Sequence, residues 1–418
     1  MIGFGADNAS VMMGHKAGVQ AKFKEKNKDL FVLGCTCHSL HLCSSAACTK
    51  LPKSVEEFVR SLYNHFSNSA KRIADFEQFQ FFIDLKPHKM LRPSQTRWLS
   101  LQAVVDRVLT VWEALKLYFT NFIFETKIDS LHVDGILLEH LKNPIYILYL
   151  LFLSYILNVI NSMNLIFQSE NTQSQNLYSK FTSTYKTILK NYIKKDITNN
   201  MQLSKINTAN PDFFVNLEDL YIGPKAALFL SENSILESEL NKFRVNILGF
   251  YVELSTQIRK RFNFDDTFLQ FLTNFQPKVA MSGDIASIFE AQKYFKFLNL
   301  SPQKLDLEWR MLPDIDLKKQ TTDFDSFWSH VFDCKNELDI EMFPNLTKLI
   351  KTLMCLPHSS AAAERKFSKL SLIKNDLRNR LNITTCNSIL LSLDMLDNNV
   401  CYTWQPSEKL LQQKPKYL

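Results

Sequence analysis

Residues 2–35 have the sequence IGFGADNASVMMGHKAGVQAKFKEKNKDLFVLGC, and they decide the fold class of the N-terminal part. Residues 2–6 and 31–35 are short apolar runs with the length and composition of buried parallel strands. Between them, residues 7–10 offer side chains that cap a helix, and residues 11–26 have a helical pattern ending in a lysine-rich turn. The stretch therefore predicts a strand, one helix and a second strand parallel to the first.

Beyond residue 38 the apolar side chains recur with a helical period, most clearly over residues 99–119. The chain has only 9 glycines in 418 residues, which argues against a turn-rich all-β fold. With 46% hydrophobic and 22% charged residues it is neither disordered nor fibrous. We expect a mainly α protein with a small α/β part, and the length suggests roughly two to three domains.

Charge and cysteine content narrow the possible partners and compartments. The formal net charge of +7 permits a polyanionic partner without requiring one, because charges of both signs mostly cancel. The 8 cysteines are sparse, which favours a reducing, intracellular compartment over a disulfide framework. The first residues show neither a basic nor an apolar leader segment, so we expect no secretory signal and a cytoplasmic or nuclear protein.

A long apolar segment needs a separate explanation. Residues 143–169 contain no charged side chain, and residues 145–160 approach the length of a membrane span. Pro144 suits the first position of a helix, and a stripe of Asn and Gln side chains follows one helix face from residue 158 to 168. We expect the core helix of a globular domain; a membrane span is the alternative.

Six potential zinc ligands lie within 14 residues. They are Cys35, Cys37, His38, His41, Cys43 and Cys48. A closed zinc site needs four convergent ligands, and one helix face presents only two of these side chains together. We therefore expect no bound metal here and interpret these side chains as packed, or as lying beside a nucleic acid.

The C-terminal segment is the most strongly patterned. Residues 357–360 predict a helix start, after which four apolar residues form one seam: Phe367, Leu370, Leu377 and Leu381. Residues 364–380 carry two acidic and six basic side chains, which we expect to face solvent or phosphate. A second helix follows, with the apolar residues Ile389, Leu390, Leu393 and Leu396. Residues 343–356 are also rich in apolar side chains, so we predict self-association through roughly residues 343–397.

Four short motifs give the chain a family resemblance. In order they are GADNASVM at 5–12, CTCHSL at 35–40, TRWLS at 96–100 and SSAAAERKFS at 359–368. Each is weak alone, but together and in this order they resemble hAT-superfamily transposases, especially the domesticated, zinc-finger-associated animal proteins. In that family a BED-type zinc finger often precedes the rest.

The resemblance implies a ribonuclease-H-like fold interrupted by a large all-α insertion, and here truncated at its N-terminus. We expect four parts: residues 1–38 as the remnant of the ribonuclease-H-like domain, 39–340 as the helical insertion, 341–400 as its C-terminal helices with the hAT dimerisation region, and 401–418 as a tail.

The same resemblance matches Asp7 and Glu364 to two carboxylates of an Asp-Asp-Glu site. Such a site holds two Mg²⁺ ions that activate a nucleophile and stabilise the leaving oxygen. The first aspartate belongs on a strand before Asp7, for which six residues leave no room. The alternative is structural: Asp7 caps a helix and Glu364 is an ordinary first-turn carboxylate.

Candidate DNA contacts also follow from the resemblance. Arg97 and Trp98 match an Arg-Trp motif, and an indole stacks well on an unpaired base; alternatively, Trp98 anchors the helix that follows. Cys35 and His38 match a Cys-x-x-His motif beside the catalytic core. Arg365 and Lys366 lie on the basic face of the C-terminal segment.

We therefore expect a transposase-derived protein without nuclease activity that dimerises through its C-terminal hAT region and binds DNA. The first alternative is a Mg²⁺-dependent DNA transposase whose N-terminal part is missing from this chain. The second is a host DNA-binding transcriptional regulator. We expect a homodimer, a nuclear location, and no cofactor, membrane or small-molecule substrate; Mg²⁺ would be needed only by the enzyme.

Overall fold

The computed structural model describes residues 1–93, 101–126, 132–315, 323–396 and 405. The described part is mainly helical with one small parallel sheet, which confirms the expected fold class at this coarse level. The contacts divide the chain into two compact units, Met1–Ser359 and Ser360–Leu418. This division differs from the predicted boundaries at 38 and 340, which stay predictions.

The N-terminal stretch forms the predicted strands. β1 (Gly3–Ala6) pairs in parallel with β2 (Phe31–Gly34), and Gly3 lies opposite Phe31. The predicted single helix over residues 11–26 is wrong, because α1 (Ser10–Met13) and α2 (Val19–Lys26) are separate. Gly14 ends α1 in an extended conformation, and glycines at 14 and 18 give the connecting turn little helix propensity.

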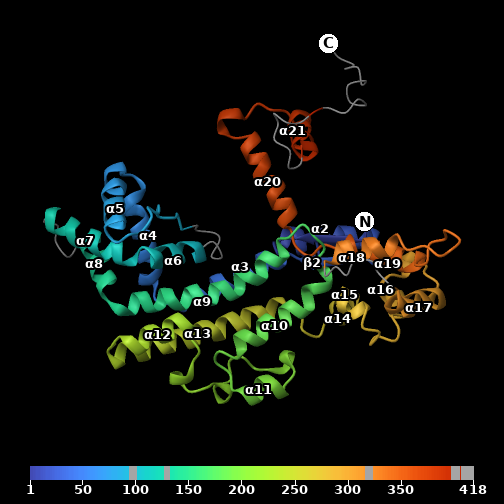
Figure 1. Ribbon diagram of the computed structural model, residues 1–418, viewed down its shortest axis with the longest axis horizontal. Coiled ribbons are helices and arrows are strands. Elements are labelled where there is room, and N and C mark those ends of the chain that lie inside the picture. Colours follow the sequence, from blue (N-terminus) through green and yellow to red (C-terminus); the bar gives the residue numbers. More distant parts are fainter. Residues whose placement is uncertain (94–100, 127–131, 316–322, 397–404, 406–418) are drawn as a thin grey trace, which may run out of the picture. The chain divides into compact units, whose positions relative to one another are not determined.

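Most of the first unit is helical. Its elements after the sheet are α3 (Thr36–Cys48), α4 (Lys53–Ser67), α5 (Ala70–Phe82), α6 (Leu101–Thr110), α7 (Trp112–Thr126), α8 (Val133–Lys142), α9 (Pro144–Phe167), α10 (Leu177–Leu189), α11 (Lys195–Asn200), α12 (Pro224–Glu232), α13 (Glu237–Arg261), α14 (Thr267–Leu272), α15 (Pro277–Ala280), α16 (Ala291–Tyr294), α17 (Pro302–Met311), α18 (Phe324–Phe332) and α19 (Pro344–Met354). Figure 1 shows α4–α8 near one end of α9, and the sheet with α14–α19 near its other end.

Two hydrophobic clusters form the core of this unit. The larger involves α3–α10, α12 and α13, and the smaller involves α14–α19. β2 contributes to both, because Leu33 packs against the larger cluster and Phe31 packs against the smaller. The ring centroids of Phe31 and Phe268 lie 5.2 Å apart. The small sheet therefore lies where the two clusters meet.

Helix α9 is the apolar segment noted in the sequence. Pro144 occupies its first turn, and the Asn143 side chain accepts a hydrogen bond from the backbone N–H of Ile145 at 2.9 Å. By length and composition this helix could span a membrane. Its polar stripe has partners within the protein: the Gln102 amide donates to Asn158 Oδ1 at 3.2 Å and accepts from Asn161 Nδ2 at 2.5 Å.

The second unit contains α20 (Ala361–Ile373) and α21 (Ile383–Leu396), joined by a short 3-10 turn at Asp376–Arg378. We call α20 and α21 with their connection the C-terminal hairpin. The continuous helical seam predicted from Phe367 to Leu381 is wrong, because α20 ends at Ile373. The side chain of Asn375 accepts hydrogen bonds from the N–H groups of Leu377 and Arg378 and so begins a separate turn.

Candidate functional site

The carboxyl ends of β1 and β2 meet at one edge of the sheet. Asp7 follows β1, is exposed, and accepts a hydrogen bond from the backbone N–H of Ala9 at 3.3 Å. The neighbouring Asn8 donates from Nδ2 to Ser39 Oγ at 2.7 Å, which connects this turn to the first turns of α3. The end of a parallel strand is a usual position for functional side chains, because the following turn exposes them. The position of Asp7 therefore fits both interpretations, a carboxylate that stabilises the turn and a carboxylate of a functional site.

Cys35 and His38 lie at the same edge. Cys35 is buried and caps α3, with its Sγ accepting the backbone N–H of His38 at 3.5 Å. The two residues are thus brought together through a helix cap. Further along α3, burial raises the pKa of the Cys43 thiol to about 12 and also raises that of Cys48. These two thiols are neutral near pH 7 and have the character of packed core residues.

Pro357, which is distant in sequence, packs on β1. A Cβ atom built on Gly3 would lie 2.5 Å from Pro357 Cδ, and one on Gly5 would lie 2.8 Å from Pro357 Cβ. Contacts this short are not possible for a real side chain, so the two glycines are needed for the proline ring to approach the strand.

The two residues after Pro357 continue this attachment. The Thr36 hydroxyl donates to the carbonyl oxygen of His358 at 2.8 Å, and Ser359 Oγ donates to the carbonyl oxygen of Phe167 at 2.6 Å. His358 Nε2 lies 3.3 Å from the carbonyl oxygen of Ser169. Residues 357–359 are therefore held against β1, the start of α3 and the end of α9.

Glu364 follows this attached segment by five residues. It lies in the first turn of α20 and accepts a hydrogen bond from Ser360 Oγ at 2.9 Å. Asp7 and Glu364 belong to different compact units. In the described part of the chain, no three His, Cys, Asp or Glu side chains are grouped closely enough to hold a metal ion. A Mg²⁺ site that includes these two carboxylates stays a prediction.

The other candidate DNA contacts fall in two places. Arg97 and Trp98 lie outside the described residues. Arg365 is half-buried on α20, and the ammonium group of Lys366 binds both carboxylate oxygens of Asp394 on α21. This hydrogen bond lowers the pKa of the Asp394 carboxyl, and Lys369 adds a longer contact of 3.8 Å. These two lysines thus connect the helices of the C-terminal hairpin.

The predicted dimerisation residues occupy different environments. Phe367, Leu377 and Leu393 are exposed, whereas four others are half-buried: Leu370, Leu381, Ile389 and Leu390. Leu396 ends α21, and its side chain lies outside the described part. Residues 343–356 belong to the region predicted to self-associate, but their apolar side chains mostly lie in the core of the first unit. Six of their apolar side chains are buried in the smaller core cluster: Phe343, Leu346, Leu349, Ile350, Leu353 and Leu356.

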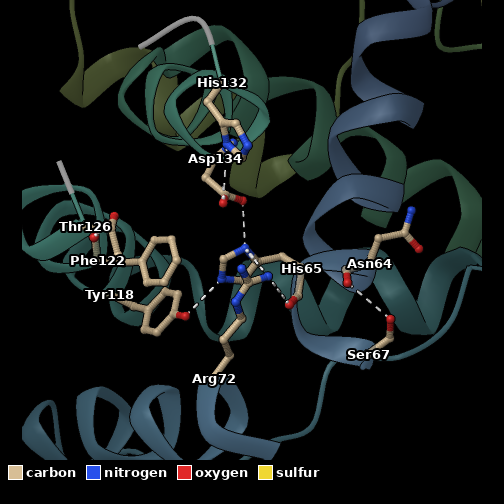
Figure 2. Close-up of polar contacts among 9 residues, drawn as sticks. All are labelled: Asn64, His65, Ser67, Arg72, Tyr118, Phe122, Thr126, His132 and Asp134. Atoms are coloured by element: carbon tan, nitrogen blue, oxygen red, sulfur yellow. Dashed lines mark hydrogen bonds and ion pairs between the residues drawn. The ribbon is translucent and has the colours of Figure 1, made fainter. Parts of the chain in front are cut away.

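A buried polar network, which sequence analysis missed, joins α4, α7 and α8. His65 Nδ1 lies 2.7 Å from Asp134 Oδ1, and His65 Nε2 lies 2.9 Å from the Tyr118 hydroxyl (Figure 2). From α5, Arg72 donates to the backbone oxygen of His65 at 3.0 Å. The available signal was the position of His65 on the buried face of amphipathic α4.

Burial determines the charge state of this network. The His65 side chain is 1% exposed, and its pKa is lowered because desolvation outweighs the attraction of Asp134. A neutral imidazole with its hydrogen on Nδ1 donates to Asp134 and accepts the Tyr118 hydroxyl hydrogen. Burial likewise raises the pKa of Tyr118 and lowers that of His140 on α8. The network therefore stabilises the contact between these helices in its neutral-histidine form.

Comparison with known protein families identifies the C-terminal part. Residues 310–396 match the family model of the hAT family C-terminal dimerisation region. The match begins at the end of α17 and includes α18, α19 and the C-terminal hairpin. It overlaps the predicted dimerisation region and begins about thirty residues before its predicted start at 341. Residues 310–396 are therefore similar to the C-terminal dimerisation region of the hAT family.

Proposed function

We propose that this protein is a transposase-related chain whose function is self-association through residues 310–396. The match of these residues to the hAT dimerisation region carries the proposal. Exposed large apolar side chains in the same region support it, among them Phe367 and Leu391. Exposed apolar side chains gathered in one region are typical of protein interfaces.

Sedimentation equilibrium of the purified chain at micromolar concentration tests this function. We expect a species of about twice the chain mass of 48.6 kDa. A single 48.6 kDa species across the concentration range would refute self-association. Because a hetero-oligomer would also leave the isolated chain monomeric, the experiment tests the homodimer specifically.

We infer that β1, β2 and the attached residues 357–359 belong to a ribonuclease-H-like domain, as the motif resemblance implies. Their parallel pairing and the contact of Pro357 with Gly3 and Gly5 support this inference. On the same basis, the long helical part between them is an insertion, with α9 as its core helix. The hydrogen bonds of the α9 polar stripe support a core position over a membrane span.

We propose that the chain does not cleave DNA on its own. The resemblance implies three carboxylates, and these 418 residues contain matches for two, Asp7 and Glu364. An assay for nicking and strand transfer with Mg²⁺ or Mn²⁺ tests this. Activity that disappears in the Glu364→Gln variant would overturn the proposal, because it would show a working carboxylate site.

A functional transposase is the second candidate, and one observation favours it. Residues 357–359 are held at the carboxyl edge of the sheet that also carries Asp7, and the resemblance matches the next part of the chain, at Glu364, to the glutamate of the site. Asp7 and Glu364 would then bind Mg²⁺ together with a carboxylate supplied from outside this chain. DNA binding, a nuclear location and a role as a transcriptional regulator are further proposals that derive from the resemblance.

A further inference from the structure

The hAT-matched region consists of two parts with different packing. In its first part, α18 and α19 bury their apolar faces in the smaller core cluster, with Trp328 and Leu349 fully buried. The N-terminus of α19 is also satisfied, because the Glu308 carboxylate of α17 accepts the N–H groups of Asn345 and Leu346 at 3.2 and 2.7 Å. This part is therefore an integral piece of the first unit.

The C-terminal hairpin is different because its described residues bury few apolar side chains. Among its described residues, buried apolar side chains are limited to Ala361, Ile373 and Cys386. Large apolar side chains are instead exposed on both helices, including Leu372 at 81% and Leu391 at 64%. The helices of an isolated hairpin this short are marginal in water, since most helix stability comes from packing an apolar face.

The ion pairs between α20 and α21 add little to the small amount of apolar packing in the hairpin. The ion pairs of Lys366 and Lys369 with Asp394 are solvent-exposed, and exposed pairs of this kind contribute little. Residues 360–394 contain six basic and three acidic side chains, a net charge of +3. The hairpin thus exposes more large apolar side chains than it buries, and its net charge is moderately positive.

We propose that the interface between two copies of this chain is formed by the C-terminal hairpin alone, and that association completes the packing of α20 and α21. This inference rests on the proposed self-association and locates it within the matched region. The occupant of the exposed apolar surface is the hairpin of a second copy, since the surface lies within the residues that match a dimerisation region. A two-fold pair brings the same patch of each copy together, which suits a single hairpin repeated twice.

Matched substitutions test the location of the interface. The Leu372→Glu/Leu391→Glu double variant places carboxylates on exposed hairpin positions and spares the core of the first unit. The control is Leu338→Glu/Ile340→Glu, two exposed positions in the matched region outside the hairpin. By sedimentation, we expect the hairpin variant to dissociate with a Kd at least ~100-fold weaker, because four carboxylates become buried without partners, and the control to remain dimeric.

Hydrogen exchange tests the coupled packing. In the unmodified chain, amides of α20 and α21 should exchange more slowly as protein concentration rises, whereas amides of α9 should not change. In the hairpin variant, α20 and α21 should exchange rapidly at every concentration. Protection of α20 and α21 that is independent of concentration would refute the coupling.

The outcomes separate this inference from the function on which it rests. A wild-type monomer at all concentrations would refute the proposed self-association. A wild-type dimer that survives in the hairpin variant, or that dissociates in the control variant, would leave self-association intact and refute the hairpin interface. Raising the NaCl concentration should strengthen association, because it screens two surfaces of equal charge; weakening by salt would contradict an apolar interface.

Discussion

Removing the Tyr118 hydroxyl is a direct test of the buried network around His65. In the Tyr118→Phe variant, the ring still fits among Phe66, Phe76 and Phe119, whose centroids lie 5.1, 5.6 and 5.2 Å from that of Tyr118. The change therefore removes a single hydrogen bond, the one of 2.9 Å to His65 Nε2.

The expected magnitude follows from the burial of the acceptor. His65 is 1% exposed at its side chain, so water does not replace the lost donor. Leaving a buried polar atom unpaired costs about 1–3 kcal/mol. At about 1.4 kcal/mol per tenfold change in an equilibrium constant, the helices around His65 should open about 5 to 150 times more often.

Native-state hydrogen exchange of α4 and α7 is the appropriate assay, because a chain of this size with two compact units does not guarantee a two-state transition. Tyr63→Phe on α4 is the matched control, since within the described residues the Tyr63 hydroxyl has no hydrogen bond. It should leave exchange unchanged. Equal exchange in the Tyr118→Phe variant and the unmodified chain would refute the proposed energetic role of the network.

Four further predictions concern pH, a helix cap, the sheet and helix α13. Burial keeps the folded-state pKa of His65 below 6.5, so the neutral imidazole stabilises the fold above about pH 6.5, and this stabilisation is lost as the pH falls. The His65→Gln variant, which cannot be protonated, should therefore show less acid sensitivity in the amide exchange of α4. Glu308→Ala should destabilise the start of α19 by about 1–3 kcal/mol, measured as faster amide exchange there, with α9 unchanged as the control. Gly5→Ala should loosen β1, because its Cβ would lie 2.8 Å from Pro357, and faster exchange of the β1 amides would report this. Gly249→Ala in α13, where the nearest atom lies 3.7 Å away, should instead stabilise the helix by about 1 kcal/mol, measured as slower amide exchange of α13.

Local patterns in the sequence predicted the elements that depend on neighbouring residues. The apolar runs at 2–6 and 31–35 became β1 and β2, and α9 begins at Pro144 as expected. A strand length, a helix period and a helix cap each require only a few consecutive side chains. The same local pattern failed at Gly14, where the helix ends early.

The family motifs predicted the dimerisation region, and the match at 310–396 supports it. They did not indicate which apolar side chains within it are available to a partner. The apolar faces of α18 and α19 are covered by α14–α17, whereas few apolar side chains are buried among the described residues of the C-terminal hairpin. A hydrophobic pattern predicts that a helix face is buried, but the segment that covers this face depends on how the rest of the chain packs.

The polar contacts that organise the candidate sites were decided by tertiary structure alone. His65 meets Asp134 from a position 69 residues away, and Thr36 meets His358 across 322 residues. The periodicity of the sequence determines the secondary structure around each of these residues. Which of them meet depends on how the helices pack, because a hydrogen bond requires atoms within about 3 Å, and no local pattern specifies that distance between remote segments.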